Sequence, residues 1–337
     1  MANEKTPMKK LVLIPACALA AMMAFAGARG PVALAQQPAA AAVESLLVQN
    51  DVYMLAGGGA NVTMQVGDQG IILVDTGSAP ASERVLAAIR RVSDKPIRYV
   101  INTTSDADHT GGNDAIGAKA GRAIPGRNLT AVGAIMIAHE NVLNRMSAPA
   151  GGAAPAPSTA WPTDIYFTEQ KDLYLSGTAI QIMHQPMAHT DGDSMVYFRR
   201  ADVISAGDVI RTAGYPVIDV ARGGSISGTL DALNRLLDVI VAGEKGEGGT
   251  MVVPGHGRIS DEAEVVEYRD MVTIIRDRVQ DLMKKGQTLA QIKAARPTLE
   301  YDGLHGGDRA WTPDMFVEAI HRTLSSPTPQ RTSAAAR

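Results

Sequence analysis

The stretch NTTSDADHTGGN, residues 102–113, carries the most information about this chain of 337 residues. It follows a short apolar run that we predict to be a strand, and active-site groups of layered α/β folds lie just beyond the carboxyl ends of strands. Asp106, Asp108 and His109 offer carboxylate and imidazole groups, which are ligands that zinc takes in proteins. The glycines at 111–112 let the backbone turn sharply and come close to a metal without a clash from Cβ.

Four further segments carry ligand-type or turn residues, and each follows a predicted strand. They are DTG at 75–77, HTDGDS at 189–194, GD at 207–208 and PGHG at 254–257. Each is a weak signal alone, but five such segments in this order are hard to obtain by chance. Together they resemble the metallo-β-lactamase superfamily, whose metal-binding loop has the pattern H-x-H-x-D-H followed by a glycine-rich turn. The resemblance covers about residues 44–260.

The fold that this resemblance implies is an α/β (α+β) structure, the four-layer αββα sandwich in which helices flank two mixed β-sheets. The chain's own pattern agrees, because a strand-rich part followed by helices occurs twice, as expected for two similar halves packed face to face. In the first part we predict strands at 46–55, 61–66, 71–74 and 97–102, helices at 82–92 and 131–146, and a mobile low-complexity segment at 147–159. In the second part we predict strands at 165–167, 172–175, 179–184, 194–198, 203–206 and 251–253, and helices at 225–241, 261–285, 289–295 and 313–324.

The resemblance also implies which side chains hold metal. Carried over position by position, Asp108, His109 and His256 form one site, and Asp208 is a carboxylate shared between two sites. Two imidazoles and two carboxylates make a complete ligand set for one zinc ion.

The second site departs from the family pattern. Its first two histidine positions hold Thr104 and Asp106, which leaves His189 as its one imidazole beside the shared Asp208. A hydroxyl is a poor ligand, and an oxygen-rich site favours Mn, Mg or Ca over Zn, or stays empty. We therefore predict one tightly bound zinc ion and a second ion that is weakly bound or absent, with Mn or Fe as alternative metals.

Several roles stay open at this point. Asp106 has three interpretations, as a substitute metal ligand, a general base or a solvated loop carboxylate. We expect Asp75 to support the ligands from outside rather than to bind metal itself, and Asp191 and Asp193 to brace their loop. His139 is kept as a distant candidate ligand.

The activity that the resemblance implies is hydrolysis, in which a bound metal lowers the pKa of a water molecule and supplies hydroxide as the nucleophile. Asp108 is expected to orient that water as well as to bind metal, and Asp106 is the second catalytic candidate. This fold handles β-lactams, lactones, thioesters, phosphoesters and sulfate esters, so the small-molecule substrate is left open. Because Thr104 and Asp106 replace the histidines of the H-x-H pattern, we rank a β-lactamase below a general metal-dependent hydrolase. A non-catalytic, metal-stabilised binding protein and a di-iron redox protein are the alternatives from other classes.

The first residues of the chain predict export. Lys9 and Lys10 precede an apolar run, and ALA at 33–35 is a small-residue cleavage site. We therefore predict a periplasmic or secreted protein with a signal peptide at 1–35, a flexible linker at 36–43, a metallo-β-lactamase-like domain at 44–325 and a disordered tail at 326–337. Cys17, the one cysteine in the sequence, lies inside the signal in only a faint match to a lipoprotein box, so we expect no lipoprotein.

The net charge of the chain limits the classes of partner that it can bind. The net charge is −3, and it becomes −6 without residues 1–35, with 28 basic against 34 acidic residues. This gives no electrostatic footprint for nucleic acid. No segment after the signal is apolar enough to span a bilayer, so we expect no membrane association after cleavage. The oligomeric state is not set by the sequence.

Overall fold

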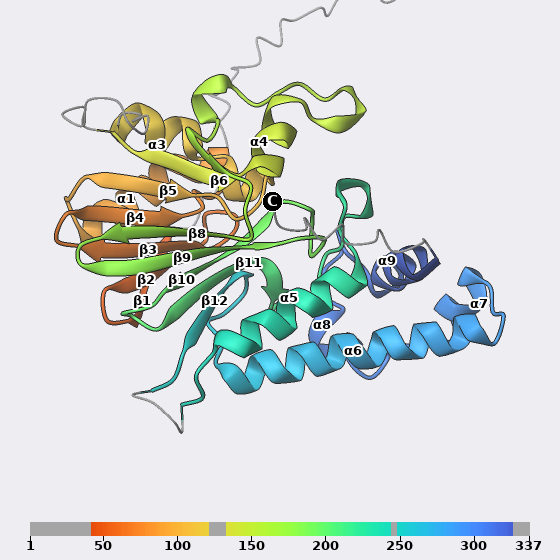
Figure 1. Cartoon of the computed structure of the whole chain (residues 1–337). Helices are drawn as coiled ribbons and strands as arrows, with labels where there is room; N and C mark the ends of the chain where they lie inside the picture. The colour runs from red at the N-terminus through yellow and green to blue at the C-terminus, as the bar shows by residue number, and fades with distance from the viewer. Residues whose placement is uncertain (1–41, 121–132, 244–247, 326–337) are drawn as a thin grey trace, which may run out of the picture. The chain divides into compact units, whose positions relative to one another are not determined.

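Two mixed β-sheets packed face to face form the centre of the structure, a computed structural model that describes residues 42–120, 133–243 and 248–325 (Figure 1). The predicted signal peptide (1–35), most of the predicted linker (36–43) and the predicted tail (326–337) lie outside the described residues. Helices cover the outer face of each sheet. This arrangement confirms the predicted αββα sandwich.

The first sheet has its seven strands in chain order, with antiparallel pairing from β1 to β4 and parallel pairing from β4 to β7. Its strands are β1 (Glu44–Gln49), β2 (Val52–Ala56), β3 (Val62–Gly67), β4 (Gly70–Val74), β5 (Ile97–Ile101), β6 (Ile135–His139) and β7 (Asp164–Tyr166). Parallel neighbours bring the carboxyl ends of β4, β5 and β6 to one edge, and the loop after β5 is the stretch that contains Asp106, Asp108 and His109.

The second sheet has the order β12-β11-β10-β9-β8, and its one parallel pair is β11 with β12. Its strands are β8 (Gln170–Leu175), β9 (Thr178–Gln185), β10 (Asp193–Phe198), β11 (Val203–Arg211) and β12 (Met251–His256). The parallel pair has a consequence for the site, because it sets Asp208 of β11 beside the end of β12, where His256 lies.

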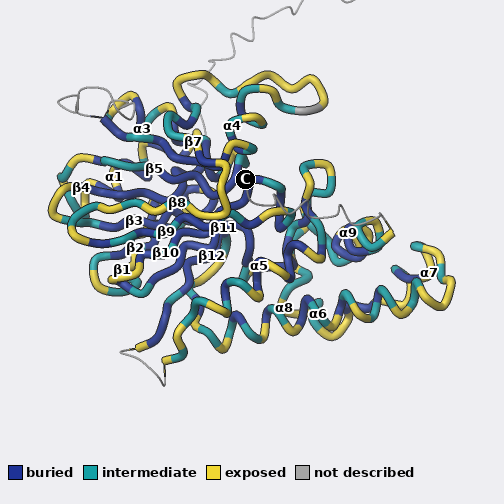
Figure 2. The backbone as a smooth tube through the Cα atoms, in the orientation of Figure 1, coloured by how far each residue is buried: buried dark blue, intermediate teal, exposed yellow. Residues whose placement is uncertain are grey.

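Burial on both faces explains why the strand sequences are continuously apolar. All five residues of β4 are buried, as are the first eight of β11, which is typical of strands covered on both sides. Ile72 and Val74 of the first sheet share an apolar cluster with Ile182 and Phe198 of the second. Figure 2 shows this interior as buried backbone between more exposed outer helices.

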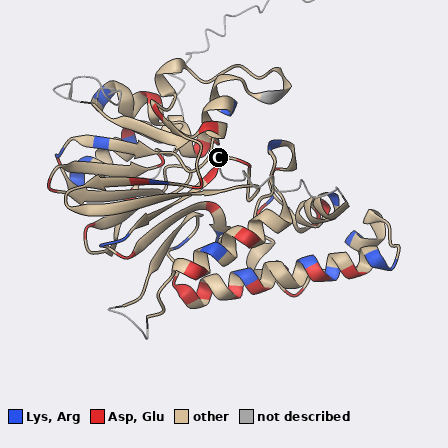
Figure 3. Cartoon of the chain, in the orientation of Figure 1, with Lys and Arg blue, Asp and Glu red and all other residues tan. Residues whose placement is uncertain are grey.

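The outer helices each bury one apolar stripe, as amphipathic helices do. In α1, Val85, Leu86 and Ile89 pack on the first sheet. The helices over the first sheet and near the loop after β5 are α1 (Ser82–Val92), α2 (Ala107–Thr110), α3 (Asn113–Ala120) and α4 (Glu140–Ser147). The helices that follow β11 are α5 (Ile226–Val239), α6 (Glu262–Lys284), α7 (Leu289–Ala294), α8 (Asp302–His305) and α9 (Pro313–Ser325). Figure 3 shows charged residues of both signs along the outer helix α6.

Side-chain caps fix where several of these helices begin. Ser225 accepts a hydrogen bond from the Gly228 amide at the start of α5, and Asp261 accepts one from the Glu264 amide at the start of α6. Such caps satisfy amides that have no partner within the helix. Among the described residues, no helix is both long and apolar enough to cross a bilayer.

Two sequence-based predictions of secondary structure were wrong. The single strand expected at 46–55 is a hairpin, β1 and β2, whose turn includes Asn50 with a positive φ of 52°. The helix expected at 131–146 is strand β6 followed by helix α4, with His139 capping the helix. A short apolar run fits a buried strand as well as a buried helix, so periodicity alone cannot separate them.

The segment at 147–159 contains two short 3-10 turns, η2 (Ala150–Gly152) and η3 (Ser158–Ala160). Ala160 is buried, and its carbonyl accepts a hydrogen bond of 3.0 Å from Nδ2 of Asn113 in α3. This segment is therefore tied at its end to the helix that follows the glycine-rich turn.

Candidate metal centre

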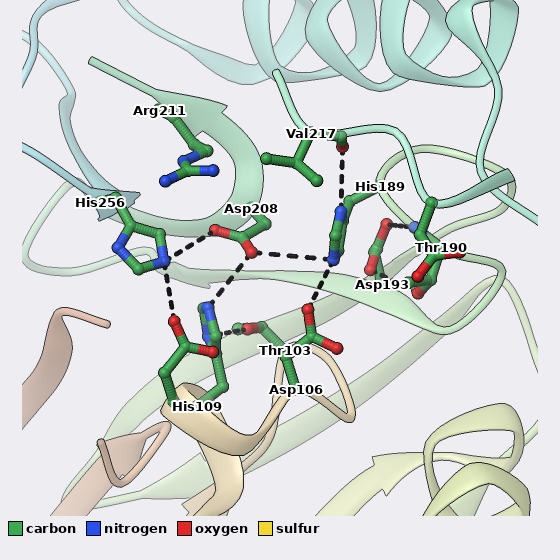
Figure 4. A network of polar contacts seen from close by, with 12 residues as sticks. Thr103, Asp106, His109, His189, Thr190, Asp193, Asp208, Arg211, Val217 and His256 are labelled. Atoms are coloured by element: carbon green, nitrogen blue, oxygen red, sulfur yellow. Dashed lines mark hydrogen bonds and ion pairs between the residues drawn. The ribbon is translucent and has the colours of Figure 1, made fainter. Parts of the chain in front are cut away.

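Four of the five segments singled out in the sequence meet at one end of the two sheets (Figure 4), and Asp75 of the fifth contacts His109 there. Asp108 and His109 lie in α2, the short helix after β5. His189 lies between β9 and β10, while Asp208 and His256 lie in β11 and at the end of β12. Figure 4 shows His109, His189 and His256 directed towards the Asp208 carboxylate from three sides.

The distances around Asp108, His109 and His256 match those between ligands of one metal ion. His256 Nε2 lies 3.2 Å from Asp108 Oδ2 and 3.6 Å from Asp208 Oδ1, and His109 Nε2 lies 3.4 Å from Asp208 Oδ2. Two ligand atoms that are each about 2.1 Å from a tetrahedral zinc ion lie about 3.4 Å apart. Asp108, His109 and His256 therefore form a candidate group for one metal ion, and Asp208 lies beside both of its imidazoles.

Two buried atoms of this group have no hydrogen-bond partner among the described residues. They are His109 Nε2 and Asp208 Oδ1. Buried polar atoms are almost always satisfied, so each unsatisfied one calls for an explanation. Both atoms face the space between the four side chains, and a metal ion bound there would satisfy both of them. The residues present thus fit the metal that the fold family implies.

The electrostatics of the group favour a cation. Burial opposes the charge of Asp208, but the surrounding imidazoles, first among them His109, hold the pKa of Asp208 far below its ordinary range. Burial also lowers the pKa of His109, but the carboxylates of Asp208 and Asp75 outweigh burial and raise this pKa well above its ordinary value. A proton and a metal ion therefore compete for the same negatively charged position.

Asp75 sets the orientation of His109, as the sequence predicted. Its Oδ2 lies 2.7 Å from His109 Nδ1, and its carboxylate also accepts hydrogen bonds from the amide (2.8 Å) and hydroxyl (2.6 Å) of Thr103. A carboxylate can only accept, so Nδ1 carries the proton and donates it. When a metal ion displaces the second proton of His109, the lone pair is therefore on Nε2, the atom that faces Asp208.

Replacing Asp75 with asparagine is expected to weaken metal affinity by about 10–100-fold. The amide would either lose a Thr103 hydrogen bond or present its NH₂ group to His109 Nδ1, which would move the imidazole proton to Nε2 and block the ligand lone pair. Zinc titration against a competing chelator measures this. Asp114→Asn, an exposed carboxylate in α3, is the matched control. Equal affinity in Asp75→Asn and wild type would contradict the role given to Asp75.

The second group, Asp106, His189 and Asp208, is arranged differently. His189 Nε2 lies 2.8 Å from Asp106 Oδ2, which is a direct hydrogen bond, and 3.8 Å from Asp208 Oδ2. The other oxygen of Asp106 forms a short ion pair with Arg222 NH1. Both oxygens of Asp106 and the Nε2 atom of His189 thus already have polar partners in this group.

The structure narrows the interpretations of Asp106. Its side chain is only 18% exposed and is ion-paired, so it is not a solvated loop carboxylate. Burial raises its pKa, but hydrogen bonds from His189 and Arg222 outweigh burial and lower the pKa well below the ordinary value. A carboxylate with so low a pKa is a weak general base near neutral pH. Its prediction as a ligand stays a prediction.

Arg222 was missed in the sequence. It lies in η4 (Val220–Arg222), far along the chain from Asp106, and arginine is not a metal ligand. No motif marks it, and only the ion pair with Asp106 in the folded chain identifies it. Thr104, at the other altered position, is 1% exposed, and its hydroxyl has no hydrogen-bond partner in the described part of the chain.

The loop that carries His189 is braced as expected. Asp193 accepts hydrogen bonds from the amide and the hydroxyl of Thr190, both at 2.7 Å, and Asp191 forms an ion pair with Arg145. His139 takes no part in either ligand group. It stacks on His184 at a ring distance of 3.7 Å, and burial lowers its pKa to about 4.

The glycine-rich turn after His109 leaves no room for a side chain. A Cβ added to Gly112 would come 2.4 Å from the carbonyl oxygen of Thr76, which is backbone and cannot move aside. Gly112→Ala is therefore expected to lower the free energy of unfolding by about 1–3 kcal/mol, measured by urea denaturation. Gly303→Ala, with nothing within 4 Å of the added Cβ, is the control and should change little. Equal stabilities of the two variants would refute this steric account.

Comparison of the sequence and fold with known proteins identifies the family. A sequence profile described as the metallo-beta-lactamase superfamily matches residues 55–258. The chain is 26% identical over 254 residues to a "Linear primary-alkylsulfatase" of Pseudomonas sp. (strain ATCC 19151), which is 65% of this chain and 46% of that protein. The chain thus spans about half the length of the curated relative that it matches.

Solved structures show the same fold. The stereoselective inverting sec-alkylsulfatase Pisa1 from Pseudomonas sp. superposes with a TM-score of 0.55 at 18% identity, covering 83% of this chain and 50% of that one. A metallo-beta-lactamase from Pontibacter korlensis superposes with a TM-score of 0.51 at 15% identity, covering 68% and 99%. With the profile matching more than half of its residues, the chain belongs to the metallo-β-lactamase superfamily.

Proposed function

We propose that this protein is an exported, metal-dependent hydrolase that works with one tightly bound metal ion. The observation that carries the proposal is the candidate metal group of Asp108, His109 and His256 with Asp208 beside it, in which His109 Nε2 and Asp208 Oδ1 are buried without a hydrogen-bond partner among the described residues. Two imidazoles and two carboxylates suit zinc best, and the same set also accepts Mn or Fe.

The side chains at this centre have different proposed roles. A metal ion bound there supplies a Lewis acid and lowers the pKa of a water molecule. Asp75 holds the proton of His109 on Nδ1, and Asp208 stays ionised between the imidazoles. Asp108 is 41% exposed and His256 22%, whereas His109 is fully buried. We therefore expect substrate and water to reach the centre from the side of Asp108 and His256, and we propose that Asp108 orients a water molecule there.

The substrate class that we propose first is a sulfate ester. The supporting observation is the 26% identity to a protein named as an alkylsulfatase, because the sequence match carries more weight than likeness of fold alone. A β-lactam is the second candidate, supported by the fold that this chain shares with metallo-β-lactamases.

A substrate screen with matched histidine variants tests the proposal. The zinc-loaded protein is assayed with primary and secondary alkyl sulfates, a chromogenic β-lactam, a lactone and a phosphodiester. We expect turnover of one class, retained in His321→Ala on the outer helix α9 and lost in His256→Ala. Unchanged turnover in His256→Ala would show that this centre is not the catalyst. A protein that binds zinc but hydrolyses none of these classes would support the alternative of a non-catalytic binding protein.

Export is proposed from residues 1–35 alone, and fractionation tests it. When the full chain is expressed in a bacterial host, we expect the protein in the periplasm or medium with an N-terminus near Gln36. A full-length protein that stays in the cytoplasm would contradict this part of the proposal without affecting the hydrolase centre.

A further inference from the structure

We infer that the guanidinium group of Arg222 takes the place of the second metal ion in this active site. Arg222 NH1 pairs with Asp106 Oδ1 and lies 3.3 Å from the Ser105 hydroxyl. Asp106 is the residue at which the family pattern would supply a ligand histidine. A permanent positive charge is thus already present at the carboxylate that a second ion would need. This inference rests on the proposed single-metal hydrolase.

The position of Arg222 is fixed by several contacts rather than by the ion pair alone. Its Nε donates to Asp219 Oδ2 at 2.7 Å, and its amide donates to Asp219 Oδ1 at 2.9 Å. Its carbonyl accepts hydrogen bonds from the Asp191 amide (3.0 Å) and from Arg145 NH2 (3.1 Å). The side chain is only 27% exposed. Such a network holds the guanidinium in one orientation, unlike that of a mobile surface arginine.

Asp106 and His189, which could otherwise bind a metal ion, are hydrogen-bonded to each other. Both oxygens of Asp106 are taken, one by Arg222 and one by His189. The other nitrogen of His189, Nδ1, lies 2.9 Å from the carbonyl oxygen of Val217 and donates to it. With Nδ1 as a donor and Nε2 bonded to Asp106, His189 has no nitrogen free for a metal unless the bond to Asp106 breaks. A second ion would have to break that bond and also lie next to a like charge.

The two ligand groups therefore differ in a way that the distances show. In the first, the two imidazoles lie 3.2–3.6 Å from the nearest carboxylate oxygens of Asp108 and Asp208, and His109 Nε2 and Asp208 Oδ1 have no hydrogen-bond partner in the described residues. In the second, the closest pair is 2.8 Å apart, and each of its two side chains has a further polar partner. The site then holds one metal and one organic cation, and the guanidinium supplies a single positive charge at the position where a second metal would bind.

Metal stoichiometry tests this inference without reference to activity. The purified full chain and its variants are dialysed against excess zinc, passed through a desalting column and analysed for zinc per chain. We expect one zinc in wild type and two in Arg222→Met, which keeps the aliphatic stem but removes the charge. The double variant Arg222→Met with Asp106→Asn should return to one, because it loses the carboxylate ligand of the second ion.

Two further variants separate charge from general disturbance. Arg222→Lys keeps a positive charge beside Asp106 and should stay at one zinc. Arg235→Met removes a different partly buried arginine, one that contacts the His184 carbonyl, and should also stay at one. Circular dichroism confirms that each variant is folded before its zinc is counted.

Each outcome has a distinct meaning. Two zinc ions in wild type would overturn the inference even if Arg222→Met cannot be prepared. One zinc in both wild type and Arg222→Met would overturn it while leaving the proposed hydrolase intact. No zinc in any protein would contradict the proposed function itself.

Discussion

Replacing Asp208 with asparagine is expected to abolish tight metal binding and to lower hydrolysis by at least about a hundredfold. Among the described residues, Asp208 is the one carboxylate within 4 Å of three imidazoles, those of His109, His189 and His256. Changing a residue that only supports a ligand already costs about 10–100-fold in metal affinity or activity, so loss of the ligand itself must cost more. The neutral amide also removes the negative charge that favours a cation between the buried imidazoles.

Zinc per chain and kcat/KM on the substrate found in the screen measure the effect. Asp238→Asn, which changes an exposed carboxylate on α5, is the matched control and should behave as wild type. If Asp208→Asn kept a full equivalent of zinc, the centre proposed here would be wrong, because no other side chain in the described structure is placed to take over from Asp208.

Removal of the metal is expected to lower the melting temperature by about 10 °C. A metal that binds only the native state stabilises it by about 4 kcal/mol when its free concentration is a thousand times Kd. For a domain of this size, each kcal/mol shifts the melting temperature by about 2–4 °C. Without metal, the buried atoms His109 Nε2 and Asp208 Oδ1 have no hydrogen-bond partner in the described part of the chain, and we attribute the expected loss of stability to them.

Differential scanning fluorimetry with and without a chelator measures this shift, and one equivalent of zinc should reverse it. His256→Ala, which lacks a ligand, should respond far less to the chelator. If elemental analysis showed that zinc had been removed but the melting temperature had not changed, the metal would not contribute to the stability of the native state.

The order of motifs predicted the fold, and the structure brings the residues that it singled out close together. Asp108, His109, Asp208 and His256 are separated by up to 148 positions, yet each follows a predicted strand, and strands in a layered fold end at a common edge. The contact of Asp75 with this loop was also predictable, because Asp75 directly follows β4, the neighbour of the strand β5 that leads to the loop. These predictions depended on elements with a strong local signal.

The parts that could not be predicted depend on contacts between distant residues. Arg222 acquires its role only from the ion pair with Asp106, which lies 116 positions earlier in the chain. The apolar residues before His139 fit a strand or a helix equally, and pairing with β5 decides for the strand. By contrast, the turn at Asn50 did have a local signal, because the three polar residues at 49–51 interrupt the apolar stretch where the chain turns with a positive φ.

The candidate ligands come from both sheets, so the centre is complete only when the two halves of the chain have packed together. The first half of the chain contributes Asp108 and His109 from the loop after β5, and the second half contributes Asp208 and His256 from β11 and β12. Neither half holds a complete set. A metal at this centre therefore acts as a crosslink between the two halves, and it can bind tightly only after β12, the last strand, has been synthesised and paired with β11.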